Sequence, residues 1–180
     1  MKKIFVVSHC ILNTASKVHQ DESGLQEEYK LRRQFLHMAL EQNIQLLQLP
    51  CPEFILYGSR RWGHVRSQFE HPMFRKSCVE LFEPVLMQLQ EYASDPLNFS
   101  VRGIVSVEGS PSCGFTQTCL ADWGGEQADW DHSGKQLPPV RMVNEPGAFM
   151  GIVARSLREN SLDIPILTLQ QAVDLLCDNL

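Results

Sequence analysis

The sequence lacks any apolar run long enough to cross a membrane, which takes roughly 20 residues. It also lacks the apolar segment and small-residue cleavage site that mark a secretory signal peptide. These two absences predict a cytoplasmic protein without a membrane partner. Positive charge is scarce as well, since 16 Lys and Arg stand against 21 Asp and Glu. Because nucleic-acid binding needs a concentrated basic surface, we expect no nucleic-acid partner and favour a small molecule.

Internal repeats, low-complexity tracts and linkers are absent too. The 180 residues therefore predict a single domain, 1–180. Such a domain buries about 70% of the surface of its unfolded chain and needs no disulfide framework. Six cysteines are nevertheless present. In a reducing compartment their thiols are free for metal binding, catalysis or core packing.

Four short apolar runs predict buried strands, and stretches with helical periodicity separate them. The expected strands cover residues 3–8, 44–49, 101–107 and 164–169. Alternating strands and helices are typical of a parallel sheet with right-handed crossovers. We therefore predict an α/β fold of the doubly wound, Rossmann-like class, with about four to five parallel strands and helices on both faces.

Local signals suggest where the helices begin and end. Ser23 with Gln26 resembles a capping box, and Thr168 is expected to cap the last helix. Pro72 and Pro146 are placed to open helices, because proline is tolerated in the first turn. Pro84 is expected to kink or divide the helix that Pro72 opens.

Two stretches show no clear periodicity. Pro50 and Pro52 are expected to prevent a helix directly after the second strand, so that residues 54–71 form a long excursion above the sheet. Residues 115–143 are rich in Trp, Gly and Pro, and they predict a loop or small hairpin insertion that acts as a lid.

Three cysteines follow three of the predicted strands. Cys10, Cys51 and Cys113 each stand just past the carboxyl end of a strand. Parallel sheets of this class bind ligands at that edge, so three thiols distant in sequence can converge on one site. Cys78 and Cys177 lie on apolar helical faces and are expected in the core, whereas Cys119 falls in the insertion.

The chemistry of three converging thiols stays open at this point. Structural zinc usually takes four ligands in local pairs such as Cys-x-x-Cys, and no such pair occurs here. Single, distributed cysteines fit an iron–sulfur cluster better, and three of them would leave one iron of a 4Fe-4S cluster without a protein ligand. The alternative is that the cysteines merely pack at strand ends.

The sequences around these cysteines resemble a known family. V-S-H-C at residues 7–10, C-P-E at 51–53 and S-P-S-C-G at 110–114 are similar to motifs of the 2-thiouracil desulfidase (TudS-type) family of small iron–sulfur enzymes. The resemblance spans residues 4–114 and implies that Cys10, Cys51 and Cys113 hold a 4Fe-4S cluster. It also implies that the unique iron captures the sulfur of a thiolated nucleobase, and that water replaces this sulfur.

The chain departs from that family at two places. Many members carry Arg-Tyr-Asp-Gly after the first cysteine and a Gly-Gly-Leu-Pro-like stretch after C-P-E. Here residues 13–17 read N-T-A-S-K and residues 54–58 read F-I-L-Y-G. These differences indicate a divergent branch whose thiolated substrate need not be 2-thiouracil.

Replacing C=S by C=O also needs a proton acceptor for water and donors that orient the ring. Glu53 lies two residues after a proposed ligand and is the candidate general base; the alternative is a structural carboxylate near a helix start. Ser110 and Ser112 flank Pro111 beside Cys113, where a hydroxyl can orient substrate or relay a proton. The alternative for both serines is hydrogen bonding within their own turn.

Other residues have a functional and a plainer interpretation. Ser8 and His9 can tune a cluster by hydrogen bonding, or simply be its neighbours. The helix start at 145–148 can bind an anion, although most helix starts bind none. Three arginines can attract a phosphate or form a solvated face: Arg60, Arg61 and Arg66. Two tryptophans can cover a planar ring or anchor the insertion: Trp123 and Trp130.

The leading hypothesis is thus a hydrolytic desulfidase acting on a small thiolated heterocycle such as a thiouracil. A non-catalytic iron–sulfur or zinc module that binds or senses is the alternative. A thiol–disulfide enzyme is a third reading, and the absence of Cys-x-x-Cys counts against it. Cys119 is an ordinary thiol or an occasional fourth ligand.

Overall fold

The structure of the protein is a computed structural model that describes residues 1–125 and 136–178. A four-stranded sheet and a separate two-stranded sheet form its β structure. Within the described ranges, every helix is too short or too polar to cross a membrane. The strands are β1 (Lys2–Val7), β2 (Gln45–Gln48), β3 (Phe99–Val105), β4 (Thr118–Leu120), β5 (Arg141–Val143) and β6 (Ile166–Leu167). The helices are α1 (His9–Leu12), α2 (Gln26–Glu41), α3 (Pro52–Tyr57), α4 (Pro72–Ser94), α6 (Ala148–Glu159) and α7 (Leu169–Cys177), with 3₁₀ turns at Thr14–Ser16, Glu22–Leu25 and Arg66–Phe69.

The main sheet has the strand order β2-β1-β3-β6, and all its neighbouring strands are parallel. Apolar, β-branched side chains dominate the central strand β1, whose last four residues are buried on both faces of the sheet, as in α/β proteins. The predicted α/β class and the four strands are confirmed. Because parallel strands end at the same edge, the segments after β1, β2 and β3 meet there.

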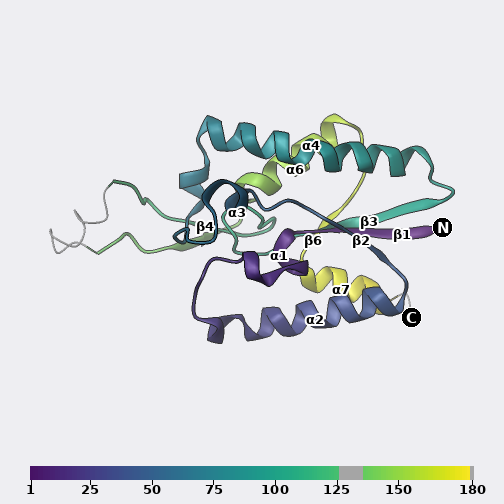
Figure 1. Cartoon of the computed structure of the whole chain (residues 1–180), viewed down its shortest axis with the longest axis horizontal. Coiled ribbons are helices and arrows are strands. Elements are labelled where there is room, and N and C mark those ends of the chain that lie inside the picture. The colour runs from purple at the N-terminus through teal and green to yellow at the C-terminus, as the bar shows by residue number, and fades with distance from the viewer. Residues whose placement is uncertain (126–135, 179–180) are drawn as a thin grey trace.

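Helices cover both faces of the sheet. Figure 1 shows α4 and α6 on one face and α2 and α7 on the other. Large aromatic side chains pack on both faces of the sheet. Phe35 of α2 meets Phe5 of β1 edge-on at 5.6 Å between ring centroids, and Phe82 of α4 meets Phe149 of α6 at 6.3 Å. Edge-to-face pairs of this kind add about 0.5–1.5 kcal/mol beyond area burial.

Several predicted helix boundaries are confirmed. Pro72 is in the first turn of α4, and Thr168 caps α7 with a full capping box that includes Gln171. Asn43 lies two residues after the end of α2 and has a positive φ of 54°, which asparagine tolerates better than most residues.

Other boundary predictions are wrong. Pro52 does not prevent a helix but starts α3, because proline at the first helical position loses no hydrogen bond. Pro84 lies inside α4, so the alternative that it divides this helix is wrong. Pro146 precedes the Gly147 N-cap of α6 and so lies before the helix.

The predicted capping box at Ser23 is also absent. Asp21 caps the 3₁₀ turn there by accepting the Ser23 backbone N–H at 3.1 Å, and α2 itself begins only at Gln26. Cys78 is fully buried, as predicted for a core thiol. Cys177 is exposed although its neighbour Leu176 is buried, because successive residues of a helix point in different directions and only Leu176 of the two faces the core.

The insertion at 115–143 contains an antiparallel pair, β4 with β5. It extends away from the sheet beyond the carboxyl ends of its strands (Figure 1). An isolated bridge between Gly109 and Thr118 attaches it to the loop that follows β3. Trp130, proposed to cover a ring, lies outside the described residues.

Candidate functional site

Three cysteines from three strand ends line one cavity of about 360 Å³. Cys10 lies in α1, which follows β1 directly, and Cys51 is the N-cap of α3, where its Sγ accepts the Phe54 N–H at 3.4 Å. Cys113 lies in the loop after β3 and is 6% exposed. The convergence expected from the strand order is therefore present in the folded chain, while Cys78 and Cys177 lie outside this cavity.

Burial keeps these thiols protonated. Desolvation raises the pKa of Cys10 to about 11, although the ammonium of Lys17 opposes the shift. Desolvation also raises the pKa of Cys51 and, further still, that of Cys113, with repulsion from the neighbouring Cys10 adding to the effect at Cys113. Each of the three must lose a proton before it can bind a metal, so binding would release protons.

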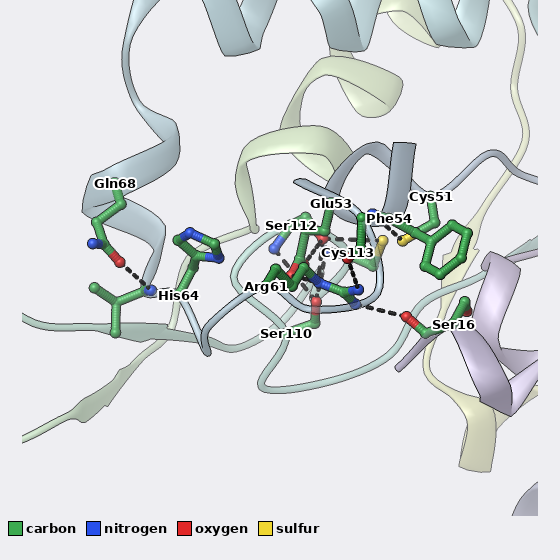
Figure 2. A network of polar contacts seen from close by, with 12 residues as sticks. Ser16, Cys51, Glu53, Phe54, Arg61, His64, Gln68, Ser110, Ser112 and Cys113 are labelled. Atoms are coloured by element: carbon green, nitrogen blue, oxygen red, sulfur yellow. Dashed lines mark hydrogen bonds and ion pairs between the residues drawn. The ribbon is translucent and has the colours of Figure 1, made fainter. Parts of the chain in front are cut away.

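Glu53 and Ser112 form the polar centre of the cavity. Glu53 is 9% exposed, and its Oε1 accepts the Ser112 hydroxyl at 2.5 Å. Arg61 lies on the other carboxylate oxygen, with its Nε 3.6 Å from Oε2 (Figure 2). A carboxylate with one oxygen bonded and a cation beside the other is fixed in orientation and is an available proton acceptor.

Ser110 has a different environment from Ser112. Its Oγ accepts the backbone N–H of Cys113 at 3.1 Å and that of Ser112 at 3.4 Å. Its carbonyl accepts the Thr118 hydroxyl at 2.8 Å. Ser110 lines the cavity, and these bonds within its own turn are those of the plainer interpretation given above.

The loop that carries Cys113 is held by α6. The N–H groups of Gly147 and Ala148 donate to the carbonyls of Gly114 and Pro111, both at 2.9 Å. Those of Phe149 and Met150 donate to the carbonyl of Ser112 at 3.0 and 2.9 Å. The first N–H groups of this helix therefore bind the loop, and the suggestion that they bind an anionic ligand is wrong.

Glu108 fixes the same loop from the other side. Its carboxylate accepts the backbone N–H groups of Phe115, Thr116 and Gln117 at 3.2, 3.0 and 2.8 Å. Burial alone would raise the pKa of Glu108, but bonds from the Ser106 and Thr116 hydroxyls and these N–H groups together lower it. Glu108 is thus a carboxylate at neutral pH and acts as a template for the turn.

Sequence reasoning assigned several residues incorrectly or missed them. Ser8 is fully buried, and its hydroxyl donates to the Val105 carbonyl at 2.9 Å rather than to the cavity. Trp123 donates to the Pro138 carbonyl at 2.8 Å, a bond that joins two parts of the insertion to each other. Arg60 is exposed, and Arg66 forms ion pairs with Glu70 and Glu145.

Arg61 was assigned incorrectly, and His64 was missed. The solvated-face interpretation of Arg61 is wrong, because its side chain is 4% exposed and lines the cavity together with His64 and Cys119. The two residues lie in an irregular segment whose path no local pattern predicts. A Lys17–Glu28 ion pair of 2.7 Å, whose residues line the same cavity, was also missed.

The donor set is chemically suited to iron–sulfur binding, with three thiols lining one cavity. Across residues 1–125 and 136–178, no three His, Cys, Asp or Glu side chains are arranged to hold a single metal ion. A cluster makes a different demand from a single ion, because each cysteine binds its own iron. Cys10, Cys51 and Cys113 are the residues that would hold one.

Comparison with known proteins gives one relative. No family model matches the sequence, and no solved structure matches it. An archaeal protein from Methanocaldococcus jannaschii, described as "Uncharacterized protein MJ0003", is 36% identical over 112 residues. The match covers 62% of this chain and 67% of that protein. The chain therefore belongs to the same family as this uncharacterized archaeal protein.

Proposed function

We propose that the protein is a cytoplasmic iron–sulfur-dependent desulfidase that replaces C=S by C=O in a small thiolated heterocycle, such as a thiouracil or a related thiobase. One observation carries this proposal. Cys10, Cys51 and Cys113 line a single cavity whose polar centre is the bonded pair of Glu53 and Ser112. Soft ligands for a metal and a proton acceptor for water are the two requirements of the reaction.

The three cysteines would hold a 4Fe-4S cluster. When bound, such a cluster supplies a soft Lewis acid for sulfur at the iron that has no cysteine ligand. The resemblance to the desulfidase family supports the same ligand set. The cavity volume of about 360 Å³ is within the range of small-molecule sites.

Glu53 performs the proton chemistry in this proposal. Its carboxylate takes a proton from a water molecule, and the water oxygen forms the new bond to the thiocarbonyl carbon. The hydroxyl of this adduct then gives up its proton as C=O forms and the carbon–sulfur bond breaks. That proton and the one held by Glu53 both go to the departing sulfur, so that C=S plus water gives C=O plus hydrogen sulfide and the Glu53 carboxylate is restored. Ser112 holds Glu53 in the required orientation through its 2.5 Å hydrogen bond.

The test begins with protein purified and reconstituted without oxygen. It should be brown, contain about four iron and four sulfide per chain, and release sulfide from at least one thiobase, thionucleoside or thionucleotide. Glu53→Gln should keep its iron and lose turnover by about 10²–10⁴-fold, the usual contribution of a general base. Glu83→Gln, at an exposed position of α4, is the matched control and should match the wild type.

The outcomes separate the proposal from its alternative. Protein that stays colourless and free of iron after reconstitution contradicts the proposal. Protein that binds the cluster but releases sulfide from no thiolated compound is the binding or sensing module instead. Loss of iron in Glu53→Gln would make Glu53 a structural residue.

A further inference from the structure

Two buried polar atoms in the cavity wall have no hydrogen-bond partner within the described part of the chain. They are Nε of Arg61 and Nδ1 of His64. Most buried polar groups in native proteins are paired, because an unpaired one has lost its hydrogen bonds to water without replacement. Both residues line the cysteine cavity. Two such atoms in one wall indicate a ligand that completes them.

The Arg61 guanidinium is fixed in place by its other nitrogens. Nη1 donates to the Gly58 carbonyl at 3.1 Å and Nη2 to the Ser16 carbonyl at 2.6 Å (Figure 2). Nε lies 3.6 Å from the Glu53 carboxylate, which is within ion-pair distance but too long for a hydrogen bond. The Nε–H is therefore held rigidly in the cavity wall and remains available as a donor.

The His64 ring is fixed by aromatic neighbours. Its centroid is 4.9 Å from the Tyr57 ring and 5.0 Å from the Phe69 ring. Burial lowers the pKa of His64, with the Glu53 carboxylate opposing and Arg61 adding to this shift, so the imidazole is neutral at neutral pH. A neutral imidazole offers one nitrogen as acceptor and one as donor. Nδ1 can thus accept a hydrogen bond from a ring N–H.

We propose that Arg61 and His64 recognise the lactam edge of the substrate ring, with Arg61 Nε–H donating to an exocyclic oxygen and His64 Nδ1 accepting the adjacent ring N–H. This inference rests on the proposed function and narrows it to thiolated heterocycles with an O=C–N–H group beside the thiocarbonyl. A site built to bond polar groups discriminates strongly against analogues that lack them. Thiolated rings without that edge should therefore be poor substrates.

The test compares variants on 2-thiouracil. His64→Phe keeps an aromatic ring between Tyr57 and Phe69 but removes the acceptor, and Arg61→Lys keeps the charge but removes the Nε–H. Each should raise KM roughly tenfold or more, with kcat changed less and iron content unchanged. Exposed His37→Phe and Arg60→Lys are the matched controls and should behave as wild type.

Modified rings test each bond separately. Methylation of the ring N–H should raise KM of the wild type roughly tenfold, and this penalty should disappear in His64→Phe, since the bond is already lost. Removal of the exocyclic oxygen with the ring N–H kept, as in 3,4-dihydropyrimidine-2(1H)-thione, should act in the same way with Arg61→Lys. Penalties that persist unchanged in the variants overturn the assignment and leave the desulfidase activity standing.

A second measurement separates this inference from the proposed function. If the wild type releases no sulfide from any thiobase, the proposed function fails. Calorimetric titration with uracil then tests separately whether Arg61 and His64 bind a lactam edge. Binding that weakens roughly tenfold in His64→Phe and Arg61→Lys, but not in the controls, supports the recognition of a lactam edge. Equal binding by all proteins, or none by the wild type, overturns it.

Discussion

Two segments bring polar groups to the cysteine cavity, and they differ in how completely those groups are bonded. The Cys113 loop, residues 107–114, has its carbonyls bound by the start of α6 and its exit held by the Glu108 carboxylate. The opposite segment, residues 58–64, follows α3 without regular structure and carries Arg61 Nε and His64 Nδ1, two buried atoms that have no hydrogen-bond partner among the described residues. The polar groups of the Cys113 loop are bonded within the protein, whereas the 58–64 segment leaves two buried polar atoms without a hydrogen bond to any described residue.

Under the proposed function, this difference assigns a separate task to each segment. A thiol that binds metal must stand at a fixed position, so its loop is held by bonds within the protein. A wall that recognises substrate must keep donors and acceptors free until the substrate arrives. Mutations in the Cys113 loop should therefore affect metal content and folding, whereas mutations in the 58–64 segment should affect substrate binding.

Removal of one of the three proposed cluster ligands has the largest expected effect. Cys113→Ala, Cys10→Ala and Cys51→Ala should each abolish iron retention after anaerobic reconstitution, because a cluster with two cysteine ligands is poorly held. Iron and sulfide analysis per chain measures this. Cys177→Ala, at an exposed position, should retain the wild-type iron content. Full iron in Cys51→Ala would show that the ligand set is wrong.

The second-largest effect is expected from a substitution that crowds the contact between the Cys113 loop and α6. A Cβ on Gly147 would stand 2.6 Å from the Ser112 carbonyl and 2.9 Å from that of Pro111, so backbone must move. Gly147→Ala should lower the free energy of unfolding by about 1–3 kcal/mol, measured by denaturant unfolding. Gly151→Ala, in the same helix, meets only Pro146 at 3.7 Å or more and should stabilise by about 0.5–1 kcal/mol. Equal effects of the two would mean that the contact is not tight.

The Glu108 template gives a smaller effect that depends on pH. Glu108→Gln should lower the free energy of unfolding by about 1–2 kcal/mol at neutral pH, because it weakens bonds to a charged acceptor. The folded pKa of Glu108 lies below its ordinary 4.5, so its contribution is present above that value and is lost as pH falls through the folded pKa. The difference between variant and wild type should therefore shrink in acid. A difference that is independent of pH would contradict the charge-based explanation.

Alkylation of metal-free protein gives the finest test. At mildly alkaline pH, iodoacetamide should modify exposed Cys177 first and Cys113 last, because Cys113 is buried and its pKa is raised by desolvation. Cys10, whose pKa is about 11, should also be slow. Peptide mass spectrometry over time gives the order. Early modification of Cys113 would show that the loop opens readily.

Local patterns were enough to predict the sheet and the convergence of the cysteines. The apolar run at β1 is itself the signal of a buried parallel strand, and parallel order then places Cys10 and Cys113 at one edge. The boundary at Pro52 was missed because the same residue excludes a helix interior and favours a helix start. Sequence alone does not decide between these two roles.

The positions of Arg61 and His64 in the cavity could not be predicted from the sequence. Arg61 reaches the cavity through bonds to the Gly58 and Ser16 carbonyls, and no periodic pattern encodes those contacts. The start of α6 looked available for an anion, yet its N–H groups bind carbonyls 36 residues or so earlier in the chain. Both outcomes depend on tertiary contacts between distant segments.

The pairing of β1 with β3 has a consequence for synthesis of the chain on the ribosome. Cys10 emerges early, but its neighbour Cys113 follows a strand that pairs with β1 only after the segments between them have been made. A nascent chain therefore exposes single thiols and never the assembled trio. Topology alone postpones assembly of the three-thiol cavity until most of the polypeptide has been translated.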